Sequence, residues 1–131
     1  TVRDLGGAAH AIHAVRNGVA RGDIVGPRVV SAGKSISVTG GHADPSNGWR
    51  DDIYQQPGPE MGVADGPDAC RQAGRLQIKN GADVIKITAT GGVLSLSSAG
   101  LAKHFTDEEI QALVDTTHSM GRKIAAHAHG T

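Results

Sequence analysis

Two hydrophobic patterns alternate along the chain. Near-continuous apolar runs, typical of strands buried on both faces, follow stretches whose apolar residues recur at three- and four-residue spacing, as on one face of a helix. The predicted strands lie at residues 28–32, 82–88 and 123–129, and the predicted helices at 8–20, from Pro67 to about Asn80, and from Thr106 to about Met120. This alternation predicts an α/β fold with a parallel sheet, either open and doubly wound or part of an eightfold barrel.

Residues 1–7 are expected to be the end of a strand that runs into a glycine turn, so the chain is expected to begin within a fold. Residues 33–62 are rich in Gly, Pro, Asp, Asn and Ser and contain Trp49 and Tyr54. A loop of this length inside a compact fold is often functional, and we expect it to line a substrate pocket in the complete protein.

The second and third helices carry boundary signals. Pro67 suits a first helical position and Asn80-Gly81 a helix stop. Thr106 and Glu109 form a predicted capping box, in which each side chain bonds the other residue's amide.

Lys86 lies in the middle of the apolar run 82–88, where an unpaired ammonium is costly to bury. Three interpretations are open. It pairs with a carboxylate or reaches the sheet edge; it is a Schiff-base nucleophile with a lowered pKa; or it forms a carbamate with carbon dioxide and binds metal.

The run 123–129 ends in His127 and His129, which share a face if the strand continues through both. The alternatives are a surface strand end or a single core histidine bonded to a carbonyl. A catalytic zinc site needs three or more protein ligands, so Lys86 with one or two imidazoles makes an incomplete site.

The remaining histidines give weaker signals. His42 follows a strand within the long loop, where it is a candidate to contact substrate. His10 and His13 are expected on a solvated helix surface, and His118 near a helix C-terminus suits the helix dipole. His104 receives no role from the sequence.

The composition of the chain argues against two classes of binding partner, nucleic acids and membranes. The 13 basic and 13 acidic residues cancel, which removes the electrostatic case for nucleic acid or an anionic membrane. No apolar stretch reaches the length of a membrane-spanning helix. Cys70 is single and is expected to be a buried, inert thiol.

Five segments together resemble the metal-dependent amidohydrolase superfamily, in the branch of Xaa-Pro dipeptidases, arginine/lysine carboxypeptidases and imidazolonepropionase-like proteins. They are 1–6, 26–29, 40–42, 80–87 and 126–130. The resemblance covers the whole chain. It implies that residues 1–131 are a partial (β/α)-barrel domain covering about the second to fifth strands.

The resemblance also implies a site. Lys86 matches the family's carboxylated lysine, which bridges two divalent cations such as zinc, and His127 matches its fifth-strand ligand; His129 is a further candidate ligand. The first-strand His-x-His pair, the sixth-strand histidine and the eighth-strand catalytic aspartate have no counterpart here. The implied reaction is hydrolysis of an amide or peptide bond, in a dipeptide or an N-acyl amino acid, with His42 near the substrate.

Two other functions stay open. In the first, the chain is an incomplete barrel fragment that acts only as a metal-binding or interaction module. In the second, it belongs to a Schiff-base lyase that uses Lys86. The resemblance further implies a homo-oligomer, or association with the missing barrel segments.

Overall fold

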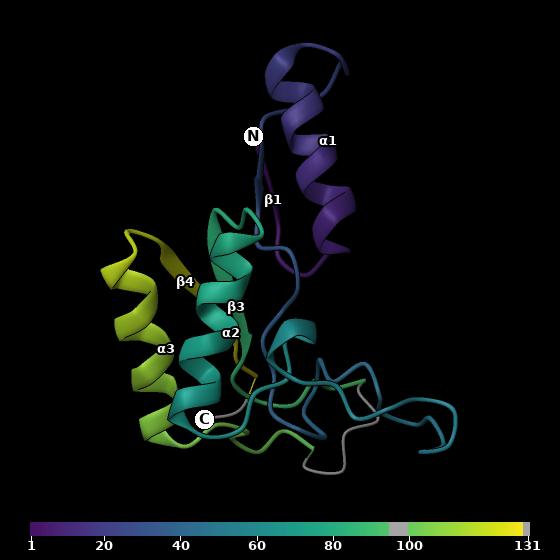
Figure 1. Cartoon of the computed structure of the whole chain (residues 1–131), viewed down its shortest axis with the longest axis vertical. Coiled ribbons are helices and arrows are strands. Elements are labelled where there is room, and N and C mark those ends of the chain that lie inside the picture. The colour runs from purple at the N-terminus through teal and green to yellow at the C-terminus, as the bar shows by residue number, and fades with distance from the viewer. Residues whose placement is uncertain (95–99, 130–131) are drawn as a thin grey trace.

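A computed structural model describes residues 1–94 and 100–129 of the chain. Parallel strands alternate with helices in it, and Figure 1 shows α2 and α3 side by side beside β3 and β4, with α1 next to β1. The elements in chain order are β1 (Val2–Asp4), α1 (Ala9–Arg21), β2 (Val29–Ser31), the short 3-10 helix η1 (Pro59–Met61), α2 (Pro67–Lys79), β3 (Val84–Thr88), α3 (Asp107–Ser119) and β4 (Lys123–His127). The predicted order of strands and helices is confirmed.

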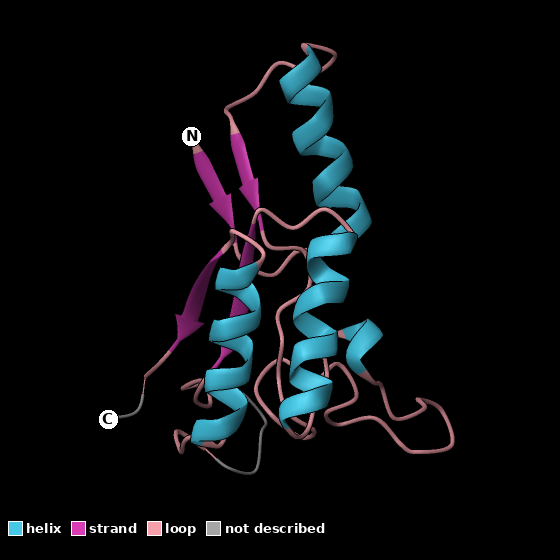
Figure 2. Cartoon of the chain, turned by 60° about the vertical axis from the view of Figure 1, so that its left-hand side comes forward, coloured by secondary structure: helices cyan, strands magenta, loops and turns pink. Residues whose placement is uncertain are grey.

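The described strands form two parallel pairs. β1 pairs with β2, and β3 pairs with β4 over five residues, with Lys86 opposite Ala125 and Thr88 opposite His127. Beyond β2, Ile36 makes an isolated parallel bridge to Ile87 of β3. In Figure 2 the arrows of both strand pairs point toward the lower end of the view, so their carboxyl ends face the same side of the molecule.

The core lies between β3 and the helices α2 and α3. Figure 2 shows the two helices running alongside each other next to the β3–β4 pair. Small and branched side chains fill this layer, as the low aromatic content requires, with Phe105 the largest of them. The other buried members of the cluster are Ile36, Ala64, Cys70, Ala73, Ala82, Ile85, Ile87, Ala112 and Leu113.

The predicted capping box is present and does more than the sequence indicates. Thr106 Oγ1 accepts the Glu109 amide at 3.3 Å, and Glu109 Oε2 accepts the Thr106 amide at 2.7 Å. The other carboxylate oxygen of Glu109 accepts the amide of Gly66, the residue that precedes α2, at 2.6 Å. One buried carboxylate therefore joins the N-termini of α2 and α3, where helix dipoles favour a negative charge.

Two details correct the sequence analysis. β4 ends at His127, so His129 lies beyond the strand and is exposed. His13 is only 5% exposed, whereas His10 lies on the solvated surface as expected. The ring of His13 fits beside Gly33, which would place a Cβ 3.0 Å from His13 Nε2, so the absence of a side chain at residue 33 gives the imidazole its place.

Among residues 1–94 and 100–129, no helix has the length and apolar character needed to cross a bilayer. His118 lies in the last turn of α3, where its predicted position near the dipole's negative end is confirmed.

Candidate active site

Lys86 is the central residue of β3 and the only one in that strand that is not fully buried. Burial lowers the pKa of its amine from the usual 10.5, because the charged form is poorly solvated there. None of the ion pairs within the described residues includes Lys86. Pairing with a carboxylate is therefore not how this part of the chain accommodates the lysine.

His127 ends β4 and gathers two other imidazoles around it. Its ring stacks on that of His42 with the centroids 4.6 Å apart and the planes at 24°, and meets the ring of His129 edge-on at 4.7 Å. His127 Nε2 is buried without a hydrogen-bond partner among the described residues. The three histidines that the sequence singled out therefore converge.

The His127 environment favours a neutral ring. Its pKa is lowered first by burial, and then by the positive charges that His42, His129 and Lys86 carry when protonated. A neutral imidazole with a free nitrogen is the form that binds a metal ion.

Backbone contacts hold His42 in place. Its amide donates to His104 Nδ1 at 3.4 Å, and the Nδ1 atom of its own ring is buried without a partner in the described part of the chain. The turn that precedes it is tied by the Gly40 amide, which donates to the buried carboxylate of Asp44 at 2.7 Å. Gly92 faces the ring so closely that a Cβ there would lie 2.5 Å from His42 Cε1.

His104 was missed by the sequence analysis, which assigned it no role. The loop after β3 folds back through an antiparallel bridge between Thr90 and Lys103, and the His104 amide then donates to Ala89 O at 2.9 Å. Burial, followed by the charge of His42, lowers the pKa of His104. The Thr90-Gly91-Gly92 turn marks this loop in the sequence, but the return contact of His104 has no local signal.

Thr90 supports the end of β4. Its hydroxyl accepts the amide of His129 at 2.9 Å, and the Ala89 amide donates to His127 O at 3.0 Å. These bonds continue the contact between β3 and β4 beyond their last paired residues, Thr88 and His127, and fix the backbone that carries both histidines.

The aromatic residues of the long loop, Trp49 and Tyr54, line a cavity that is separate from the histidine cluster. The rings of Trp49 and Tyr54 are 6.2 Å apart and line a cavity of about 270 Å³ with Ser46, Asp51 and Gln56. Neither His42 nor Lys86 lines that cavity. The expectation that these aromatics line a substrate pocket stays a prediction for the complete protein.

The donors at this site fit a divalent cation in kind and fall short in number. The imidazoles of His127 and His129 suit zinc or a related ion, and a carbamate on Lys86 would add oxygen donors. Over residues 1–94 and 100–129, however, no group of three or more His, Cys, Asp or Glu side chains is placed to hold a metal ion. Further ligands would have to come from beyond these described residues.

Comparison with known proteins gives a consistent result. The model of the Amidohydrolase family matches residues 1–131. Ochratoxinase from Aspergillus niger is 38% identical over 120 residues, which are 83% of this chain and 25% of that protein.

Solved structures agree. A Xaa-Pro dipeptidase with bound methionine in its active site is 46% identical, with a TM-score of 0.95 over 98% of this chain and 32% of that one. A prolidase complexed with N-methylphosphonate-L-proline is 33% identical, with a TM-score of 0.81 over the same shares. The chain thus spans about a quarter to a third of the proteins that it matches, and it belongs to the amidohydrolase family.

Proposed function

We propose that this chain supplies part of the active site of a metal-dependent hydrolase that cleaves amide or peptide bonds. The observation that carries the proposal is the convergence of His42, His127 and His129 beside the strand of Lys86. Lys86 is half-buried and has no ion pair within the part of the chain that the structure describes. In a parallel (β/α)-barrel, of which this chain would form about strands two to five, the carboxyl ends of the strands carry the catalytic groups.

Lys86 is the proposed carbamate. Its lowered pKa increases the fraction of neutral amine at a given pH, and only the neutral amine attacks carbon dioxide. The nitrogen–carbon bond forms, one proton leaves, and the product is an anionic carbamate. Its oxygens would be anionic donors able to hold divalent cations, which an ammonium cannot be.

His127, with His129 as a further candidate, would hold the same cations through neutral ring nitrogens. His127 Nε2 is a buried acceptor or donor without a protein partner in the described residues, as expected of a ligand. Bound divalent cations would activate a water molecule and polarise the scissile carbonyl. The remaining metal ligands and the catalytic aspartate are proposed to lie in other parts of the protein.

His42 is the proposed substrate-binding residue. It comes from the β2 side of the site and reaches His127 on the β4 side, so a substrate near the cations would meet it. The substrate class that we propose is a dipeptide or an N-acyl amino acid. Dipeptidase, prolidase and ochratoxinase relatives support a small substrate, and the oligomeric state expected from the resemblance stays a prediction.

A second candidate rests on the same lowered pKa. A neutral Lys86 amine is also the nucleophile that a Schiff-base lyase requires. Borohydride reduction in the presence of a carbonyl substrate would then attach that substrate to Lys86. The family membership favours the hydrolase, because it supports cleavage of amide bonds.

The test uses the full-length protein and a panel of dipeptides and N-acyl amino acids. Chelation should abolish hydrolysis, and zinc, manganese or cobalt should restore it. Hydrolysis that continues unchanged after complete removal of metal would contradict the proposal.

A further inference from the structure

The two described sheets meet along β2 and β3 without a regular ladder between them. Two hydrogen-bonded contacts hold the sheets together. The upper anchor, toward the carboxyl end of β3, joins Ile36 to Ile87, and the lower anchor, before the start of β3, joins Ser31 to Asp83. At the upper anchor Ile36 donates to Lys86 O at 2.8 Å and accepts the Thr88 amide at 3.0 Å, which is a complete parallel bridge between Ile36 and Ile87.

The lower anchor is half of such a bridge. The Asp83 amide donates to Ser31 O at 2.8 Å. In a complete parallel bridge between Ser31 and Ala82, the Ser31 amide would donate to Gly81 O. That amide instead donates to the carboxylate of Asp83 at 3.0 Å. A side chain thus takes the place of a backbone acceptor.

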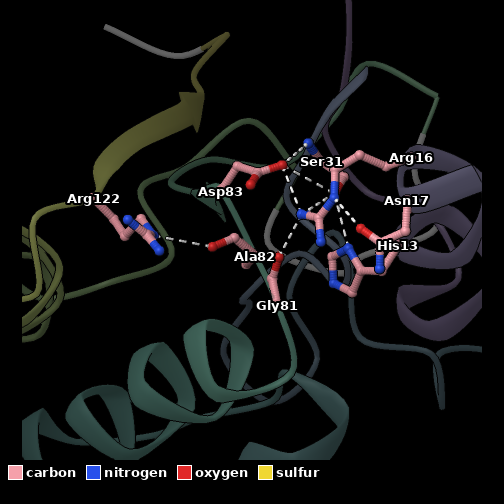
Figure 3. A network of polar contacts seen from close by, with 8 residues as sticks. All are labelled: His13, Arg16, Asn17, Ser31, Gly81, Ala82, Asp83 and Arg122. Carbon is pink, nitrogen blue, oxygen red and sulfur yellow. Dashed lines mark hydrogen bonds and ion pairs between the residues drawn. The ribbon is translucent and has the colours of Figure 1, made fainter. Parts of the chain in front are cut away.

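Arg16 of α1 bonds the backbone acceptor that Asp83 replaces. Its Nη1 atom donates to Gly81 O at 2.6 Å and to Asp83 Oδ2 at 2.8 Å. Figure 3 shows the guanidinium lying between the two acceptors, with Ser31 beside it. Arg16 therefore satisfies the carbonyl that the Ser31 amide does not use, so no backbone group of the lower anchor is left unpaired.

The hydrogen-bonded groups of the lower anchor are partly or fully shielded from solvent. Ser31 is fully buried, and its hydroxyl contacts His13 Nδ1 at 2.8 Å. The side chain of Arg16 is 18% exposed and that of Asp83 is 38% exposed. Burial acts to raise the pKa of Asp83, but the Ser31 amide and Arg16 outweigh it and the pKa is lowered, so the carboxylate stays charged.

The two anchors share one register. From Ser31 to Ile36 is the same number of residues as from Ala82 to Ile87. Residues 32–35, between the two anchors, are not in a strand, but the pairing resumes at Ile36 without a shift in register. The lower anchor therefore fixes the position of β3, and of Lys86 within it, relative to β2 and the loop that carries His42.

We propose that Arg16 and Asp83 form a register latch that joins the two sheets and acts as a pair of positioning residues for Lys86. The latch itself follows from the contacts above, whereas its effect on the reaction rests on the proposed function. No contact of either residue with substrate or metal is implied, since Asp83 directly precedes β3 and Arg16 of α1 bonds it there, at the opposite end of the strand from its carboxyl end.

The first test measures amide hydrogen exchange of the peptide that covers residues 28–36 in the full-length protein. Asp83→Ala removes the acceptor of a buried amide, so exchange there should rise about tenfold or more. Asp83→Asn keeps an oxygen acceptor and removes only the charge, so its rise should be smaller. The matched control is Asp23→Ala, which breaks the solvent-exposed Arg21–Asp23 pair of equal length, 2.8 Å.

Unchanged exchange in the Asp83→Ala protein would overturn the latch. An equal rise in the α3 peptide would overturn it too, because the effect would then be general loss of stability. If Asp83→Ala fails to fold, Asp83→Asn decides the question by the same comparison.

The second test measures hydrolysis. Arg16→Met should lower kcat about tenfold with little change in KM, and Arg16→Lys should recover most of the loss. A wild-type kcat in Arg16→Met with raised exchange would refute the positioning role and leave the latch. Absence of metal-dependent hydrolysis in the wild type would instead refute the proposed function, and the exchange result would stand by itself.

Discussion

Gly92→Ala tests whether the observed position of His42 matters. The new Cβ would lie 2.5 Å from Cε1, 2.8 Å from Nδ1 and 3.1 Å from Nε2 of the His42 ring. Gly92 is not among the glycines with positive φ, so alanine fits its backbone, and the three atoms nearest to the new Cβ all belong to the imidazole. Ordinary contact begins at 3.4 Å, and the ring must therefore recede by 3.4 − 2.5 = 0.9 Å.

A shift of that size is large for a residue that contacts substrate, since a misplacement of about 1 Å can cost about 10²-fold in rate. We therefore expect kcat/KM for the preferred dipeptide to fall about 10²-fold in the full-length protein, with the metal content unchanged. The control is Gly74→Ala in α2, where the added Cβ would lie 3.8 Å from both Leu113 and Thr116 and should leave kcat/KM as in the wild type.

Two outcomes separate the explanations. A Gly92→Ala protein with wild-type kcat/KM would refute the role of His42 at this position. A protein that loses metal together with activity would show that the substitution acts on His127, which stacks on His42, and not on substrate binding.

Three further predictions concern stability and reactivity. Glu109→Ala should lower the free energy of unfolding by about 3 kcal/mol in urea titrations, because two amides at helix N-termini lose a buried carboxylate acceptor; the exposed Glu108→Ala is the control, and equal losses would contradict the account. Burial raises the pKa of Cys70 to about 12, so iodoacetamide at pH 8 should label it only after unfolding, and rapid labelling of the folded protein would contradict its burial. Burial, followed by the charge of Arg16, lowers the pKa of His13 below 6.5; its contribution to stability is complete above pH 6.5 and is lost as pH falls, so His13→Asn should flatten the pH dependence below 6.5 by up to about 1.4 kcal/mol per pH unit, and an unchanged slope would contradict it.

Local signals in the sequence predicted the elements well. Pro67 and the Thr106–Glu109 box mark helix starts through bonds between residues close in sequence, and the structure has both. The position of Lys86 within a buried strand followed from its apolar neighbours.

Contacts between distant residues were not predictable in this way. The second oxygen of Glu109 bonds an amide 43 residues away, and the Asp83 carboxylate replaces a backbone carbonyl opposite Ser31. His13 was expected on a solvated surface because a helix repeat alone does not show that the side chain packs at the Ser31 end of β2. The end of β4 at His127 depends in the same way on where β3 stops pairing.

The site could be predicted in part. The sequence resemblance singled out Lys86, His42, His127 and His129, and the structure brings the three histidines together. Their assignment as metal ligands and substrate contact stays a prediction. His104 had no signal, because its contact with His42 depends on how the loop after β3 returns.

Native mass spectrometry with metal analysis tests the central claim most directly. The full-length protein would be prepared in bicarbonate with zinc, beside its Lys86→Met variant. The account predicts two zinc ions and the added mass of one carbon dioxide on the peptide that contains Lys86, both lost in the variant. An unmodified Lys86, or zinc binding that is the same in Lys86→Met, would contradict it.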